Sequence, residues 1–110
     1  MPEDTEPQFL YLTTTGRTSG QPHQIEIWFV AYDDAYYLCS EARDQTDWMR
    51  NIRAYRYVQV RIGSPEAPSF DAVGRAIDPA AEPERAAAVA ALFEAKYDWN
   101  DGLLVELRPF

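Results

Sequence analysis

The chain has 110 residues, a formal net charge of −8 at pH 7, 46% hydrophobic residues and 14% aromatic residues. This length and composition indicate one folded domain over residues 1–110, with residues 1–7 as a flexible start. The negative charge argues against binding to nucleic acid or to anionic lipid, because both rely on basic side chains. One cysteine permits no internal disulfide, and no apolar run approaches the roughly 20 residues that cross a bilayer. We therefore expect a soluble, cytoplasmic protein without membrane insertion.

Two strands are predicted in the first third of the chain, over residues 8–15 and 22–32. The end of the first strand and the turn that follows it, Thr13–Gly20, have the sequence Thr-Thr-Thr-Gly-Arg-Thr-Ser-Gly. Glycine permits close backbone approach, and hydroxyl and N–H groups can bind an oxyanion. The turn is therefore either a polar hairpin tip or part of an anion-binding site. A further turn at Asp33-Asp34 and a third strand over 35–40 continue the meander.

A change of period then predicts a helix over residues 45–55. Asp44 can cap its start, with Asp47 three residues later in the capping-box position. Apolar side chains recur at helical spacing at Trp48, Ile52 and Tyr55.

The second half of the chain alternates strands and loops around one long helix. The predicted segments are a strand over 57–62, a loop over 63–68, a strand over 69–77, a helix that starts within 78–83 and continues over 84–97, and a closing strand over 103–107. Pro83 lies in the first turn of that helix, where a missing N–H costs least. About six strands and two helices, in mostly meander order, predict an α+β, mainly β fold, namely a small antiparallel barrel.

Three segments in this order resemble the deazaflavin-dependent nitroreductase family, also called the quinone-reductase-like family of coenzyme F-420. They are the Thr13–Gly20 turn, the helix Asp47–Ala54 and the strand Val58–Ile62. The resemblance covers residues 10–63 well and the rest mainly by element order. It implies a split β-barrel of the FMN-binding split-barrel type, usually a homodimer. It also implies hydride transfer from a reduced deazaflavin to a planar acceptor, such as a nitro-compound, a quinone or an enone.

The same resemblance implies which positions meet the cofactor and the acceptor. The cofactor-binding positions are Thr14, Thr15, Arg17, Ser19, His23, Gln24, Glu26, Arg43, Trp48 and Asn51. Tyr97 and Trp99 match the aromatic region that borders the substrate. No catalytic nucleophile and no metal are implied, because the ring of the cofactor carries the chemistry and the protein positions it.

The chain departs from the family at the strand after the turn, where the basic pair that holds the cofactor phosphate is missing. Glu26 stands near that place, and a carboxylate repels a phosphate. His23 is mostly neutral at pH 7 if unperturbed, which leaves Arg17 and Arg43 as candidates for a phosphate grip. FMN, which carries less charge, is therefore an alternative cofactor. A non-catalytic ligand-binding or structural dimer that has lost the clamp is a second alternative.

Strand alternation places Glu26 on the same face as Trp28, either on a solvent-facing edge or aimed into a ligand pocket. Cys39 is predicted to be a buried, inert thiol. Five arginines are concentrated in one part of this acidic chain, either as a solvated face or as an electrostatic funnel for an anionic cofactor. They are Arg43, Arg50, Arg53, Arg56 and Arg61.

Overall fold

The computed structural model describes residues 7–110, apart from the side chain of Asp44. The expected flexible start, residues 1–7, lies outside the described residues except for Pro7. The elements in chain order are β1 (Phe9–Thr15), β2 (Pro22–Trp28), β3 (Val30–Tyr32), β4 (Ala35–Ser40), a 3-10 turn (Arg43–Gln45), α1 (Asp47–Ala54), β5 (Tyr57–Ile62), β6 (Phe70–Ala76), α2 (Pro83–Tyr97) and β7 (Leu103–Pro109).

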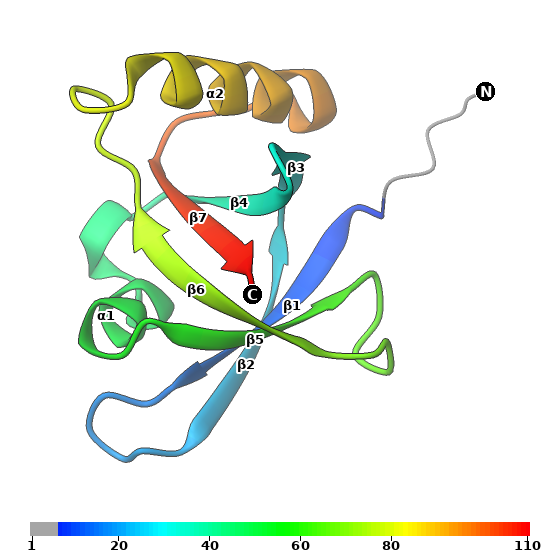
Figure 1. The fold of residues 1–110 in the computed structure, drawn as a ribbon, viewed down its shortest axis with the longest axis vertical. Helices are drawn as coiled ribbons and strands as arrows, with labels where there is room; N and C mark the ends of the chain where they lie inside the picture. Colours follow the sequence, from blue (N-terminus) through cyan, green and yellow to red (C-terminus); the bar gives the residue numbers. More distant parts are fainter. Residues whose placement is uncertain (1–6) are drawn as a thin grey trace.

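The seven strands form one antiparallel sheet in the order β2-β1-β5-β6-β7-β4-β3. The two edge strands, β2 and β3, are separated in the chain by Phe29 alone. Six gaps between strands in a flat sheet would hold the edges roughly 29 Å apart. The sheet must therefore curl until both edges meet at Phe29, which makes it a half-barrel (Figure 1). This confirms the predicted split-barrel fold.

The prediction of one continuous strand over residues 22–32 is wrong, because the chain breaks at Phe29. Phe29 and Val30 are both buried, which the two-residue alternation of a straight strand does not allow. The Phe29 N–H donates to the hydroxyl of Tyr97 instead of to a neighbouring strand. The expected meander also ends here, since β3 and β4 cross to the other edge and β4 pairs with β7.

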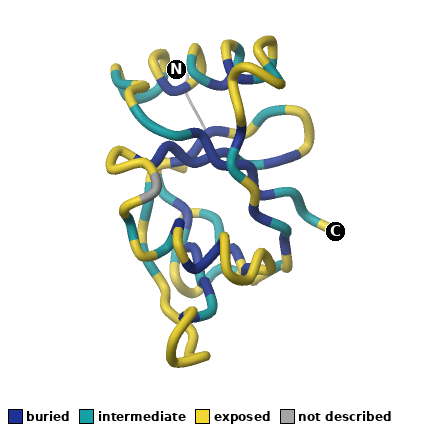
Figure 2. The backbone as a smooth tube through the Cα atoms, turned by 90° about the vertical axis from the view of Figure 1, so that its left-hand side faces the viewer, coloured by how far each residue is buried: buried dark blue, intermediate teal, exposed yellow. Residues whose placement is uncertain are grey.

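The core has two parts, one beneath each helix, and the strands between them carry most of the buried residues (Figure 2). α1 packs Met49 and Ile52 against the sheet, whereas α2 packs Val89 and Phe93 over β3, β4 and β7. Tyr55, predicted to share the apolar stripe of α1, is half exposed at the C-terminal end of that helix. Neither helix of the described chain is long and apolar enough to span a membrane.

α1 starts at Asp47, later than the predicted residue 45, whereas the start of α2 lies within the predicted range. Thr46, rather than Asp44, caps α1, because its hydroxyl accepts the N–H of Met49 at 3.3 Å. α2 begins at Pro83, at the end of the range 78–83 predicted for its start, since the carboxylate of Asp78 accepts the N–H of Ala80 and closes a separate turn before the helix. The predicted end of α2 at residue 97 is confirmed.

Candidate functional site

The turn between β1 and β2 is fastened to α1 by one buried amide. Asn51 is 4% exposed. Its Oδ1 accepts the backbone N–H of Arg17 at 3.1 Å and Nη1 of the same residue at 2.8 Å. Its Nδ2 donates to the Thr14 hydroxyl at 3.1 Å. Three hydrogen bonds hold the turn, so the structure gives Asn51, which the resemblance places near a cofactor ring, the task of holding Arg17 in place.

A polar groove of about 420 Å³ opens between this turn and α1. It is lined by Thr14, Gly16, Arg17, Thr18, Ser19, His23, Gln24, Ile25, Asp47, Trp48 and Asn51. A side chain at Gly16 would place its Cβ 2.6 Å from the Ser19 hydroxyl and 2.8 Å from the His23 ring. The glycine is therefore needed so that both polar side chains can lie over the backbone of the turn.

The polar groove carries little net charge. Nη2 of Arg17 lies 3.2 Å from the carboxylate of Asp47, and the Asp47 side chain is 86% exposed. Because the pair is exposed to water, it holds the guanidinium only loosely and contributes little to stability. A phosphate in the groove could compete with Asp47 for the same guanidinium.

A second hollow, the aromatic pocket, adjoins the polar groove and has a volume of about 580 Å³. It is lined by Phe9, Glu26, Ile27, Trp28, Cys39, Ser40, Glu41, Ala42, Thr46, Trp48 and Trp99. The curl of the sheet creates this pocket, since it brings the end of β2 against the end of β4. Trp48, on the first turn of α1, lines both hollows. Flat aromatic walls of this kind suit planar ligands.

Tyr97 lies behind the aromatic pocket and supports one of its walls. Its ring stacks on Trp28 at 4.4 Å between centroids, with 7° between the planes. Its hydroxyl accepts the Phe29 N–H at 3.0 Å and lies within hydrogen-bond distance of the carbonyl oxygens of Phe29 and Gln8. Trp99 meets the edge of Trp28 at 6.2 Å and lines the pocket itself. Of the two residues expected to border a substrate, Trp99 thus reaches the pocket and Tyr97 holds Trp28.

Glu26 and Cys39 bring polar atoms to the aromatic pocket. Oε2 of Glu26 accepts the hydroxyl of Tyr11 at 2.5 Å, from the position directly opposite on β1. This hydrogen bond is the main reason that the pKa of Tyr11 is raised above its usual value. Burial raises the pKa of the Cys39 thiol to about 11, and nearby Asp101 adds to the effect. The expectation of a buried thiol is therefore confirmed, and the raised pKa disfavours the reactive thiolate.

Two of the expected cofactor positions lie away from both hollows. Thr15 faces the opposite side of β1 from Thr14, as strand alternation requires, and lines a shallow surface hollow beside β5. Arg43 forms an exposed ion pair with Asp101 at 3.3 Å and lines a hollow beneath α2. The structure thus brings Arg17 to the groove beside Trp48 and leaves Arg43 elsewhere.

None of the five arginines between residues 43 and 61 lines either hollow. Arg50 donates to Gln45, Arg56 lies over the ring of its neighbour Tyr57, and Arg61 donates to the carbonyl of the 63–68 loop. This arrangement agrees better with a solvated face than with a funnel. Within residues 7–110, no group of three His, Cys, Asp or Glu side chains is placed to hold a metal ion.

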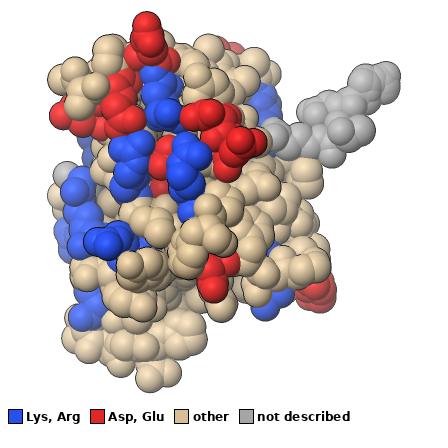
Figure 3. Space-filling model, viewed as in Figure 1, with Lys and Arg blue, Asp and Glu red and all other residues tan. Residues whose placement is uncertain are grey.

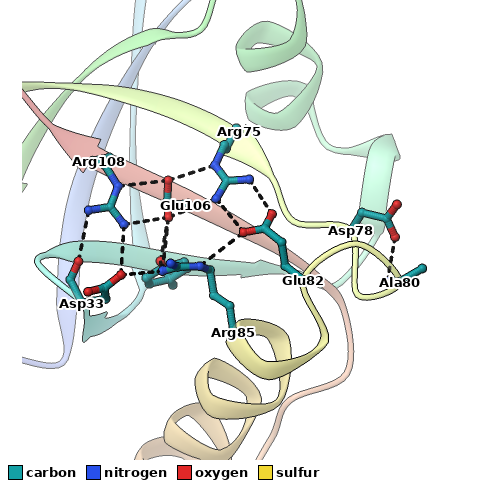
Figure 4. A network of polar contacts seen from close by, with 9 residues as sticks. Asp33, Arg75, Asp78, Ala80, Glu82, Arg85, Glu106 and Arg108 are labelled. Carbon is teal, nitrogen blue, oxygen red and sulfur yellow. Dashed lines mark hydrogen bonds and ion pairs between the residues drawn. The ribbon is translucent and has the colours of Figure 1, made fainter.

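A charged network around Glu106 was not foreseen (Figure 4). Its carboxylate is 4% exposed and accepts hydrogen bonds from Arg75 at 3.0 Å, Arg108 at 3.0 Å and the Tyr37 hydroxyl at 2.7 Å. Arg85 lies 3.7 Å away. Burial alone would raise the pKa of Glu106, but these three donors outweigh it and lower the pKa to about 2.

The network balances its own charge, and basic and acidic side chains interleave between α2 and the strands β6 and β7 (Figure 3). Glu82 pairs with Arg75 and Asp33 pairs with Arg85. Three arginines thus face three carboxylates. Because it is balanced, the network serves to join α2, the β3–β4 turn and β7, and it offers no unpaired charge to a ligand.

The comparisons with known proteins agree with this architecture. The family model described as F420H2-dependent quinone reductase matches residues 4–101. Among solved structures, the heme storage protein HutZ from Vibrio cholerae has a TM-score of 0.73 at 21% identity, over 96% of this chain and 83% of that chain. An F420 reductase has a TM-score of 0.64 at 20% identity, over 100% and 96%. An F420-H2 dependent reductase, FDR-A, has a TM-score of 0.64 at 19% identity, over 98% and 100%. No curated protein matches the chain.

Proposed function

Because the chain belongs to the F420H2-dependent quinone reductase family, we propose that it is a reductase that takes a hydride from reduced coenzyme F-420 and gives it to a small planar acceptor. The observation that carries this proposal is the pair of adjoining hollows that share Trp48. One hollow is polar and the other is aromatic. A cofactor with a flat ring and a polar tail, together with a flat acceptor, needs both kinds of surface.

The residues that line the two hollows suit the ring of such a cofactor well and its charged tail less well. Trp48 offers an aromatic wall to the ring at the junction of the two hollows. The tail carries a phosphate and glutamate carboxylates, for which the polar groove provides Arg17 together with the hydroxyls of Thr18 and Ser19. Only one guanidinium serves a tail with several negative charges, and Asp47 shares it. We therefore expect the ring to supply more of the binding free energy than the tail.

The side chains then divide the work as follows. When bound, the reduced deazaflavin supplies the hydride, and the protein orients the two reactants and excludes water. Arg17, held by Asn51, anchors the tail. Trp28 and Trp99, which line the same pocket as Trp48, confine the acceptor. Tyr97 stabilises Trp28 by stacking and needs no contact with the acceptor.

The first experiment is a titration of the purified protein with oxidised coenzyme F-420 and, in parallel, with FMN. Tryptophan fluorescence reports binding, because Trp48 lines the junction of the two hollows. Micromolar binding of F-420 together with reduction of a quinone supports the proposal. Binding of FMN alone favours the flavin alternative, and binding of neither compound favours a non-catalytic dimer.

Two matched pairs of variants locate the cofactor. Arg17→Gln and Arg43→Gln remove the same charge, but only Arg17 lines the polar groove. We expect the first to weaken F-420 binding about fivefold to tenfold and the second less than about twofold. Trp48→Ala should cost about tenfold, whereas Leu92→Ala, which truncates an exposed apolar side chain of α2 outside both hollows, should have little effect. Equal losses within either pair would refute the proposed placement.

We also propose that the chain acts as a homodimer. An exposed aromatic group supports this proposal. Tyr55, Tyr57 and Phe110 are 50%, 42% and 77% exposed, and Tyr57 contacts each of the other two edge to face. Light scattering should then give twice the mass of the chain at micromolar concentration. A monomer at every concentration would refute it.

A further inference from the structure

The aromatic pocket has an unusual balance of charge for a site that would accept any planar compound. Among the described residues that line it, two are acidic, Glu26 and Glu41, and none is Lys, Arg or His. Oε1 of Glu26 makes no hydrogen bond within the described chain, and Glu41 forms neither a hydrogen bond nor an ion pair there. Within residues 7–110, no ion pair therefore neutralises either of the two carboxylates that line the pocket.

The basic side chains near this region are directed elsewhere. Lys96, on the last turn of α2, donates to the carbonyl oxygens of Pro7 and Phe29, at 2.7 and 2.9 Å. Arg43 pairs with Asp101 beneath α2. Tyr11 donates to Glu26 through a neutral hydroxyl, and its raised pKa keeps it neutral. None of these contacts offsets the charge of the two carboxylates.

The aromatic walls of the pocket, like its two carboxylates, favour a positively charged ligand. Three tryptophans, Trp28, Trp48 and Trp99, contribute to the lining. The face of an indole is the best aromatic surface for a cation, and the attraction is larger where water is excluded. Trp28 is held flat by its stack on Tyr97, at 4.4 Å. Aromatic faces combined with unpaired carboxylates are the features that recognise an organic cation.

We propose that the aromatic pocket selects planar aromatic cations, such as N-alkylated heteroaromatic rings, over neutral and anionic compounds of the same shape. This inference deepens the proposed function, because it names the class of acceptor. Glu26 and Glu41 attract the positive charge, and the tryptophans cover the faces of the ring.

The chemistry of such an acceptor is consistent with hydride reduction. N-methylacridinium accepts a hydride at C9, where one C–H bond forms and the positive charge of the ring is lost. The hydride, which carries two electrons, comes from the reduced deazaflavin of the proposed function, where one C–H bond breaks. The deazaflavin is thereby oxidised and releases one proton to solvent. The product is neutral, so the two carboxylates no longer attract it. The pocket therefore favours the oxidised cation over its reduced product, which assists product release.

The test is an equilibrium binding measurement that needs no deazaflavin. Isothermal titration calorimetry compares N-methylacridinium with acridine, its neutral counterpart of nearly the same shape, at about pH 8, where acridine is uncharged. We expect the cation to bind at least about tenfold more tightly, and the preference to shrink in high salt. Equal affinity for the two compounds, or binding of neither, would overturn the inference.

Charge variants then assign the preference to the pocket. Glu26→Gln should weaken binding of the cation about fivefold and change binding of acridine less than about twofold. Glu41→Gln, at an exposed position, should act in the same direction and is a safeguard if the first variant folds poorly. Glu84→Gln, on the outer face of α2, is the matched control and should have no effect.

An equal loss in the Glu84 variant would mean that net charge alone attracts the cation, and would overturn the assignment. Failure of the proposed function is distinguishable from these outcomes. Selective binding of N-methylacridinium without binding of F-420 would support the charge-selective pocket and refute the proposed reductase. Binding of F-420 and reduction of neutral quinones, with no preference for the cation, would support the reductase and refute the charge-selective pocket.

Discussion

Replacing Glu106 by glutamine tests whether the buried charge network stabilises the fold. Glutamine keeps the shape of the side chain but removes the charge that three donors share. The pKa of Glu106 is lowered from 4.5 to about 2 in the folded protein. At about 1.36 kcal/mol per pKa unit, ionised Glu106 contributes about 3 kcal/mol at neutral pH. Removing one partner from a buried ion pair lowers the free energy of unfolding by a similar amount.

The sign of the pH dependence follows from the direction of the pKa shift. A carboxylate whose folded pKa is depressed stabilises the protein above its unfolded pKa and loses that contribution as the pH falls toward the folded value. The stability difference between the wild type and Glu106→Gln should therefore be about 3 kcal/mol at pH 7 and about 1.4 kcal/mol at pH 3.

Urea unfolding at several pH values, followed by tryptophan fluorescence, measures this difference. Glu84→Gln, which removes an exposed carboxylate of α2, controls for the change in net charge and should differ from the wild type by less than about 0.5 kcal/mol at every pH. A difference for Glu106→Gln that stayed constant from pH 7 to pH 3 would refute the reasoning, because the effect would then not come from the charge.

Three further predictions concern the region around the two hollows. Asn51→Ala removes three hydrogen bonds of a buried amide and should lower the free energy of unfolding in urea by about 2 kcal/mol. Asn100→Ala, on the surface, should lower it by less than about 0.5 kcal/mol. Equal losses would contradict the role of Asn51 in holding the turn. Gly102→Ala would place a Cβ 2.5 Å from a backbone carbonyl oxygen of β4 and should cost at least about 2 kcal/mol. At Gly20 an added Cβ meets no atom within 4 Å, but the backbone φ is +74°, so Gly20→Ala should cost about 1 kcal/mol in thermal melts. A smaller cost for Gly102→Ala than for Gly20→Ala would show that the structure relieves the contact at Gly102. The thiol of Cys39, with a pKa of about 11, should react with a thiol reagent far more slowly in the native protein than in urea, and equal rates would contradict its burial.

The sequence by itself determined the local elements of the fold. Alternation in residues 57–62 and the alanine-rich run over 84–97 predicted β5 and α2, and both are confirmed. These signals are local, because each reflects which side of one element faces the core. The turn with two glycines was predicted to be either a hairpin tip or part of an anion-binding site, and it joins β1 to β2 and lines the polar groove.

The tertiary structure alone decided how these elements are assembled into a site. No local pattern shows that the chain breaks at Phe29 and sends β3 to the far edge of the sheet, since that choice depends on pairing between β4 and β7. The same pairing brings the end of β2 to the end of β4 and so forms the aromatic pocket. The arginines around Glu106 come from three separate elements. Contacts between distant parts of a chain depend on the curl of the whole sheet, and a sequence read one segment at a time does not contain that information.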